Sequence, residues 1–209
     1  SCESGNGGEF PTTGGQLAYL NGRNDHFELG KYNAHYYFEI ESQYTAEEIE
    51  NAIRKVVKKH DAFRAIFLPN GMQKVLTDVP DYKVEVIHCT PENRESEILK
   101  IRNDLSHHIY KHDQWPLFTF KAVDYGEANR MIFVSFDLMV CDGDSMQIFF
   151  SDLGKILRKQ PFEERIGYSY ERYVRDLSQS RNEKRYEEDK AYWMERIPNF
   201  PEYPHVPLA

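Results

Sequence analysis

The sequence predicts one α/β domain in which strands and helices follow one another in mixed order. Short segments rich in aromatic and β-branched residues alternate with longer segments whose apolar residues recur at helical spacing. The segment RMIFVSFDL, residues 130–138, is apolar on both faces, which is the pattern of a central strand covered on both sides. We find no internal repeat that would indicate a repeat architecture.

Composition and charge exclude several classes of protein. The chain has 209 residues, 40% of them hydrophobic, which is enough for one large core or two small ones. A net charge of −8, from 26 basic and 34 acidic residues, argues against a nucleic-acid partner, which would need a basic surface. No apolar run approaches the roughly 20 residues that span a bilayer, so we expect no membrane partner. The N-terminus also lacks the layout of a secretory signal.

Cysteine usage indicates the compartment. Cys2, Cys89 and Cys141 are an odd number of residues at unrelated spacings, and they form no CxxC pair. A disulfide framework would need paired cysteines, so we expect a reduced, cytoplasmic setting.

The first part of the chain is expected to hold an arm, a short helix and a strand. Residues 1–9 are small, polar and Gly-rich, as in a flexible arm that is either a linker or a remnant left by cloning. QLAYLNGR, residues 16–23, could form one short helix ended by Gly22. HYYFEIE, residues 35–41, has the composition of a strand.

A long helix and a hairpin are expected next. Thr45 and Glu48 have the spacing of a capping box, and apolar residues then recur at helical spacing to about His60. In residues 62–76 the sequence PNG separates two apolar runs, which predicts a hairpin. YKVEVIH, residues 82–88, alternates polar and apolar residues like a half-buried strand.

A further helix and two strands follow. Thr90 is placed as a cap and Pro91 as the first helical residue of a helix that continues to about Ile109. Residues 116–124 and 130–138 are expected to be strands joined by a short turn that contains glycine.

The C-terminal part is expected to be helical and then extended. Apolar residues from Asp144 to Arg158 predict an amphipathic helix, and the charged region from Ser169 to Ile197 predicts one or two helices. The spaced prolines of residues 198–209 are typical of an extended linker. We therefore assign residues 10–197 to the domain, residues 1–9 to the arm and residues 198–209 to the linker.

The candidate chemistry lies in SFDLMVCDGDS, residues 135–145, where the central strand meets the next helix. Asp142 stands where an N-cap belongs, and the helix dipole favours its ionised form, so it is a poor proton donor and is better suited to a structural role. Asp137 ends a strand that looks buried, where an unpaired carboxylate would be costly. Asp137 therefore has a partner, opens onto a cavity, or lies at a solvated strand end.

Other groups are weaker candidates. A calcium loop is the weakest interpretation because DGDSMQIFF supplies no carboxylate ligand after Ser145. Cys141 has no identifiable base that would make it a nucleophile, and a small buried apolar role suits it better. His108 and His112 have metal-ligand spacing on a helix, but no third ligand follows, so we expect surface or packing histidines and no metal site. Arg64 could turn inward as the counter-ion of a buried carboxylate.

Asp137, Asp142 and Ser145 fit the DxxxxDxxS signature of the heterocyclization domains of nonribosomal peptide synthetases, and other blocks of the chain resemble the same family. These blocks are, in order, FPTTGGQLAYLNGR (10–23), FELGKYNAHYYFEIE (27–41), KKHDAFRAIFLPNGMQKVL (58–76), WPLFTFKA (115–122) and YWMERIPNFPEYPHVPLA (192–209). The resemblance thus covers nearly everything from residue 10 onward. It implies a chloramphenicol-acetyltransferase-like lobe with a mixed, mostly antiparallel sheet packed with helices, one half of a V-shaped, two-lobed domain. Residues 198–209 would then lead toward an absent C-terminal lobe.

The resemblance implies a reaction in natural product biosynthesis. An acyl or peptidyl thioester on one carrier is condensed with Cys, Ser or Thr on another, and cyclodehydration then gives a thiazoline or oxazoline. The implied partners are upstream and downstream carrier domains, the adenylation domain and the missing lobe. No cofactor is implied in the lobe itself, since the phosphopantetheine arms belong to the carriers. The family's proposed cyclodehydration residues belong to the second lobe, so we expect the isolated chain to be inactive.

Amide-forming condensation domains carry HHxxxDG at this place. In an ungapped comparison, Asp137 replaces the first histidine, Leu138 replaces the second, and Asp142 matches the aspartate. That aspartate is paired in the relatives with the arginine that corresponds to Arg64, which implies a structural Arg64–Asp142 salt bridge here. Two alternatives stay open: an amide-forming condensation or acyltransferase lobe, which would need a histidine in place of Leu138, and a non-catalytic docking or interaction module of the same fold.

Overall fold

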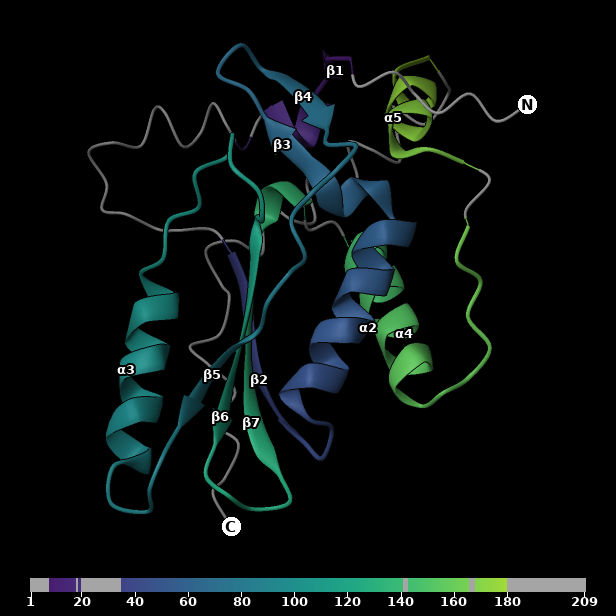
Figure 1. The fold of residues 1–209 in the computed structure, drawn as a ribbon. Helices are drawn as coiled ribbons and strands as arrows, with labels where there is room; N and C mark the ends of the chain where they lie inside the picture. The colour runs from purple at the N-terminus through teal and green to yellow at the C-terminus, as the bar shows by residue number, and fades with distance from the viewer. Residues whose placement is uncertain (1–7, 18, 20–34, 141–142, 166–167, 180–209) are drawn as a thin grey trace.

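A four-stranded sheet forms the centre of the molecule in the computed structural model (Figure 1), which describes residues 8–17, 19, 35–140, 143–165 and 168–179. For residues 178 and 179 only the backbone is described. The strand order is β2-β7-β6-β5, with bounds β2 His35–Ser42, β5 Glu85–His88, β6 Phe118–Asp124 and β7 Arg130–Asp137. β2 and β6 pair antiparallel to β7, whereas β5 pairs parallel to β6.

The central position predicted for residues 130–138 is confirmed. β7 has a paired strand on each side, and its register runs from His35 opposite Asp137 to Ser42 opposite Arg130. Its even-numbered residues, such as Val134, pack into the larger core, while Phe133 packs into the smaller core on the other face. Both faces are covered because helices lie on each side of the sheet (Figure 1).

The larger core lies beneath two helices, α2 Ala46–Lys59 and α4 Gly143–Leu157. Thr45 and Glu48 form the predicted capping box, with the Thr45 hydroxyl accepting from the Glu48 amide and the Glu48 carboxylate accepting from the Thr45 amide. Phe149 of α4 is fully buried, with its ring centroid 5.1 Å from that of Phe136 on β7. This aromatic contact ties α4 to the end of the central strand.

A second, three-stranded sheet lies above the first in Figure 1, in the order β1-β4-β3. The predicted hairpin is confirmed as β3 Ala65–Phe67 and β4 Met72–Val75, and β1 Phe10–Pro11 pairs with β4. Gly71 adopts a φ of 77° in the turn, a conformation that glycine tolerates because it has no Cβ. The short 3₁₀ helix η1, Asp61–Arg64, connects α2 to this sheet.

Helix α3, Arg94–Ser106, is shorter than the helix predicted from Thr90 to Ile109. The amide and hydroxyl groups of Thr90 donate to Asn93 Oδ1 at 2.7 and 3.3 Å, so the chain makes a turn before the helix begins. The helix ends at Ser106, whose hydroxyl donates to the carbonyls of Arg102 and Asn103 and so satisfies acceptors of the last turn. The predicted start and end were therefore both wrong.

The remaining predictions fall partly outside the described residues. Helical backbone is present at residues 14–17 and 19, so it begins two residues before the predicted 16–23 segment. Helix α5, Tyr170–Gln179, confirms the start of the predicted C-terminal helical region. Residues 1–7 of the predicted arm 1–9, the rest of the region to Ile197 and the linker at 198–209 lie outside the described part. No helix among the described residues is long and apolar enough to cross a membrane.

Candidate functional site

Asp137 ends the central strand as a buried carboxylate with partners. The residue is 2% exposed, so the solvated strand end is excluded. Its Oδ1 accepts from the Met139 amide at 2.8 Å, and its Oδ2 lies 3.2 Å from His112 Nε2. Its own amide donates to the Leu117 carbonyl at 2.9 Å, which extends the pairing of β7 beyond the regular ladder. Both carboxylate oxygens are therefore engaged, as burial requires.

The chain turns directly after Asp137. Leu138–Val140 form the 3₁₀ helix η2, and the Asp137 carboxylate closes this turn by accepting from the Met139 amide two residues on. Met139 is 2% exposed and belongs to the larger core, whereas Leu138 is half-buried. Leu138 therefore supplies no titratable group to this turn.

His112 is the functional candidate that sequence reasoning missed. It was expected to be a surface or packing residue, and packing fits a side chain that is 14% exposed, with its ring centroid 6.5 Å from that of Phe67. Its Nε2 in addition faces Asp137, which was not expected. The helical spacing with His108 does not apply, because α3 ends at Ser106. The His112 carbonyl accepts from the Phe67 amide at 2.8 Å, which fixes this segment against β3. No local sequence signal links His112 to a carboxylate 25 residues later.

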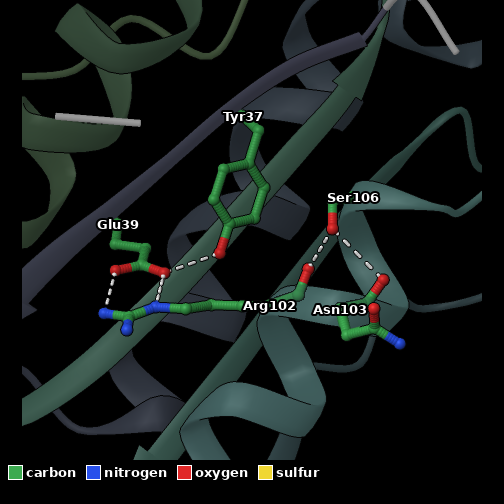
Figure 2. A network of polar contacts seen from close by, with 5 residues as sticks. All are labelled: Tyr37, Glu39, Arg102, Asn103 and Ser106. Atoms are coloured by element: carbon green, nitrogen blue, oxygen red, sulfur yellow. Dashed lines mark hydrogen bonds and ion pairs between the residues drawn. The ribbon is translucent and has the colours of Figure 1, made fainter. Parts of the chain in front are cut away.

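A polar network joins α3, the helix that precedes the segment carrying His112, to strand β2. Figure 2 shows Arg102 of α3 donating to both oxygens of Glu39 on β2, at 2.6 and 2.9 Å, and Tyr37 donating to the same carboxylate at 2.8 Å. In the same view, Ser106 bonds back to the last turn of α3. α3 is thus attached to the sheet edge and ends at a defined residue, from which the chain runs toward His112.

Tyr110 joins the same segment to the sheet. Its hydroxyl contacts Thr119 Oγ1 on β6 at 2.8 Å and Ser135 Oγ on β7 at 3.0 Å. Ser135 is two residues before Asp137, so Tyr110 joins this segment to both strands close to the end of β7. Burial lowers the pKa of His108, repulsion from Lys121 lowers it further, and Asp137 acts in the opposite sense. His108 is therefore shifted toward its neutral form.

The other half of the motif is only partly described. Ser145 lies in the first turn of α4 and is half-buried, while Asp142 lies outside the described residues. The predicted N-cap role of Asp142 and its predicted pairing with Arg64 therefore stay predictions.

Arg64 is described, and it binds main-chain carbonyls. Its Nη1 donates to the carbonyls of Val57 and Lys58 at 2.6 and 3.0 Å, and its Nε donates to Leu76 at 3.0 Å. Arg64 thus caps the end of α2 and joins it to Leu76, the residue that follows β4 of the hairpin. Burial lowers the pKa of Arg64, while the charge of nearby Asp61 acts in the opposite direction.

A second buried carboxylate lies between α2 and α4. Asp152 is 6% exposed, and its Oδ2 lies 2.7 Å from His60 Nε2 and 2.9 Å from Lys59 Nζ. Burial opposes ionisation of Asp152, but the hydrogen bonds from His60 and Lys59 outweigh it and lower the pKa of this carboxyl. We interpret the cluster as a helix-to-helix connection. In the described part of the chain, no group of three His, Cys, Asp or Glu side chains could hold a metal ion.

Comparison with known proteins places the chain in a family. A family model described as Condensation domain matches residues 24–208. Bacitracin synthase 1 of Bacillus licheniformis is 29% identical over 203 residues, which are 95% of this chain and 4% of that protein. Phenyloxazoline synthase MbtB of Mycobacterium sp. (strain MCS) is 28% identical over 202 residues, which are 96% of this chain and 17% of that protein.

A solved structure gives the same assignment. The EpoB NRPS cyclization-docking bidomain of Sorangium cellulosum superposes with a TM-score of 0.74 and 29% identity, over 92% of this chain and 39% of that one. The predicted chloramphenicol-acetyltransferase-like lobe with a mostly antiparallel sheet is therefore confirmed. The chain spans only a small part of the synthetases that it matches. It belongs to the condensation domain family, and its relatives include heterocyclization-type domains of nonribosomal peptide synthetases.

Proposed function

We propose that this chain is the N-terminal lobe of a heterocyclization domain that condenses a carrier-bound thioester with carrier-bound Cys, Ser or Thr and then closes a thiazoline or oxazoline ring. The observation that carries this proposal is the pair Asp137–Leu138 at the end of the central strand. A carboxylate and an apolar residue stand where amide-forming relatives have two histidines. The relatives whose names denote ring formation, phenyloxazoline synthase and the EpoB cyclization domain, support the same choice.

The reaction has two stages. The amine of the carrier-bound amino acid attacks the upstream thioester carbonyl, so a C–N bond forms, a C–S bond breaks, and the upstream carrier thiol takes up a proton. The side-chain thiol or hydroxyl then adds to the new amide carbonyl, and the former carbonyl oxygen leaves as water with two protons. The second stage needs a general acid for the departing oxygen.

The described residues are suited to holding the shape of the site. Asp137 uses both oxygens on Met139 and His112, so it fixes the turn at the end of β7. Ser145 lies in the first turn of the helix that follows. We assign Asp142 to a structural role as helix cap and Arg64 partner, and we place the general acid in the second lobe.

The proposed partners follow from the reaction. Two carrier domains would deliver the substrates on phosphopantetheine arms, and an adenylation domain would load the acceptor carrier. The C-terminal lobe would complete the site. We propose a cytoplasmic setting for this chain and its partners.

The test uses the polypeptide that contains this chain together with its neighbouring domains. Its carriers are loaded with an acyl donor and with Cys, Ser or Thr, and the released products are analysed by mass spectrometry. We expect a product lighter by one water than the linear amide. The 209-residue chain alone should give neither product, and turnover by it would contradict the expected need for a second lobe.

The two alternatives give different results in the same assay. An amide-forming condensation or acyltransferase lobe would release the linear amide without further loss of water. A docking or interaction module of the same fold would give no product with any loaded carrier, although it could still bind carrier or partner domains.

A further inference from the structure

The buried main chain of Met139 is held on both sides by side chains from distant parts of the molecule. Its amide donates to Asp137 Oδ1 at 2.8 Å, and its carbonyl accepts from Gln16 Nε2 at 3.0 Å. Met139 lies in the turn between the two halves of the DxxxxDxxS motif. Gln16 is 123 residues away in sequence, in the segment that opens the domain.

Gln16 is itself fixed by its surroundings. Its Oε1 accepts from the Thr13 main-chain amide at 2.9 Å, and its own main-chain amide donates to the Thr13 hydroxyl at 3.2 Å. The first bond holds the Gln16 side chain at the start of the short helical segment at residues 14–17, and the second holds its main chain there. The oxygen is thereby committed as an acceptor, so the Nε2 group is the one that faces Met139.

Gln16, Gln73 and Tyr170 form a closed ring of three hydrogen bonds. Gln73 Nε2 donates to Gln16 Oε1 at 3.2 Å, Gln16 Nε2 donates to the Tyr170 hydroxyl at 2.8 Å, and that hydroxyl donates to Gln73 Oε1 at 2.9 Å. Gln73 is completely buried, and its second amide hydrogen goes to the Pro11 carbonyl at 3.1 Å. Each of the three side chains donates one hydrogen bond to the next and accepts one from the one before. Hydrogen bonds arranged in this way strengthen one another cooperatively.

The ring brings α5 to the motif turn. Tyr170 is the first residue of α5, and its amide donates to both carboxylate oxygens of Asp61 at 3.1 Å. Its ring also lies edge-on to Phe10 of β1, with centroids 5.9 Å apart, and Figure 1 shows α5 beside β1 and β4. The opening segment, the hairpin and α5 therefore meet at one point, and that point bonds to Met139.

We propose that Gln16 is a positioning residue for the condensation site, which orients the Met139 carbonyl in the motif turn and is itself oriented by Tyr170 of α5. This inference rests on the proposed function, because the turn that it positions is part of the proposed reaction site. The alternative is that the ring only joins the opening segment and α5 to the hairpin. The two differ in what happens at the motif turn and in turnover when the ring is broken.

Two variants separate the contributions. Gln16→Glu keeps the acceptor oxygen for Thr13 and Gln73 but removes the two donated bonds to Met139 and Tyr170. Tyr170→Phe removes only the hydroxyl and leaves the direct bond between Gln16 and Met139 in place. Tyr168→Phe is the matched control, because Tyr168 is exposed and its hydroxyl bonds to Asp176 within the same region.

The first readout is hydrogen–deuterium exchange of the amides of residues 138–140 in the 209-residue chain. We expect exchange there to rise about tenfold or more in Gln16→Glu and by a smaller factor in Tyr170→Phe. Exchange in α2 should stay as in the wild type, as should all exchange in Tyr168→Phe. Unchanged exchange at residues 138–140 in both ring variants would overturn the proposal, whatever the activity.

The second readout is steady-state turnover by the complete polypeptide with loaded carriers. We expect kcat to fall about tenfold in Gln16→Glu, while the apparent KM for the acceptor carrier stays within about twofold. A raised exchange rate with unchanged kcat would overturn the positioning role and leave only a structural connection. If the wild type makes neither a thiazoline or oxazoline nor a linear amide while exchange responds as expected, the proposed function fails. The contact between Gln16 and the turn then still stands.

Discussion

The predicted salt bridge between Arg64 and Asp142 can be tested through the free energy of unfolding. Arg64→Ala removes three donated hydrogen bonds to the carbonyls of Val57, Lys58 and Leu76. Two of these bonds are partly buried and the one to Lys58 is exposed, so the exposed bond should contribute little. At about 1–1.5 kcal/mol for each partly buried bond, the carbonyl contacts alone account for about 2–3 kcal/mol.

A double-mutant cycle separates this contribution from that of Asp142. If Asp142 is a partner of Arg64, the loss of unfolding free energy caused by Arg64→Ala should be smaller in the Asp142→Asn background than in the wild type. We expect the difference to be at least about 1 kcal/mol. The assay is urea unfolding of the four chains, with the slope against urea checked for constancy. Asp104→Asn on α3 is the control. Asp104 is exposed, and α3 covers the face of the four-stranded sheet opposite to the one covered by α2, whose end Arg64 caps.

The control pair should be additive to within about 0.5 kcal/mol, as is usual for separated sites. Additivity of Arg64→Ala and Asp142→Asn within that limit would refute the predicted salt bridge. It would leave Arg64 as a cap of α2 that acts through main-chain carbonyls alone.

Three further predictions concern stability. Phe149→Ala should lower the free energy of unfolding by about 3–5 kcal/mol in urea titrations, because its fully buried ring packs 4.8 Å from that of Phe63; a loss below about 1 kcal/mol would contradict the packing. Asp152 has a lowered pKa in the folded chain, so its contribution is present above its unfolded pKa of about 3.9 and is lost as the pH falls through the folded value. The melting temperature of Asp152→Asn should therefore fall less steeply than that of the wild type between about pH 5 and pH 3, and parallel curves would contradict this reasoning. Glu39→Gln should lower the free energy of unfolding by about 0.5–1 kcal/mol, since its partner Arg102 on α3 is 39% exposed. Screening acts over about 3 Å in 1 M salt, so a loss that is unchanged in 1 M salt would argue against an ionic contribution.

The parts of the fold that the sequence predicted well are those with local causes. The capping box at Thr45 and Glu48, the hairpin turn with Gly71, and the two-sided apolar pattern of β7 each depend on residues close together in the chain. Local hydrogen bonds and side-chain periodicity suffice for such features. A local hydrogen bond also explains why the start of α3 was mispredicted. Thr90 was expected to cap the helix, but its amide and hydroxyl donate to Asn93 Oδ1 instead.

The parts of the site that could not be predicted are contacts between distant segments. His112 meets Asp137 only because α3 ends at Ser106 and the following chain folds back against β3. Gln16 meets Met139 only because the opening segment, the hairpin and α5 converge. No spacing or composition in one sequence encodes such contacts, whereas the resemblance to heterocyclization domains identified the motif that they surround.

The most direct test of the proposed function follows the oxygen that leaves. The donor thioester is prepared with a heavy-oxygen label in its carbonyl, and the complete polypeptide is supplied with carrier-bound Cys, Ser or Thr. Ring closure by addition of the side chain to the amide should release the label as water and give an unlabelled thiazoline or oxazoline. A linear amide that retains the label, with no ring product from any of the three acceptors, would contradict the assignment to heterocyclization.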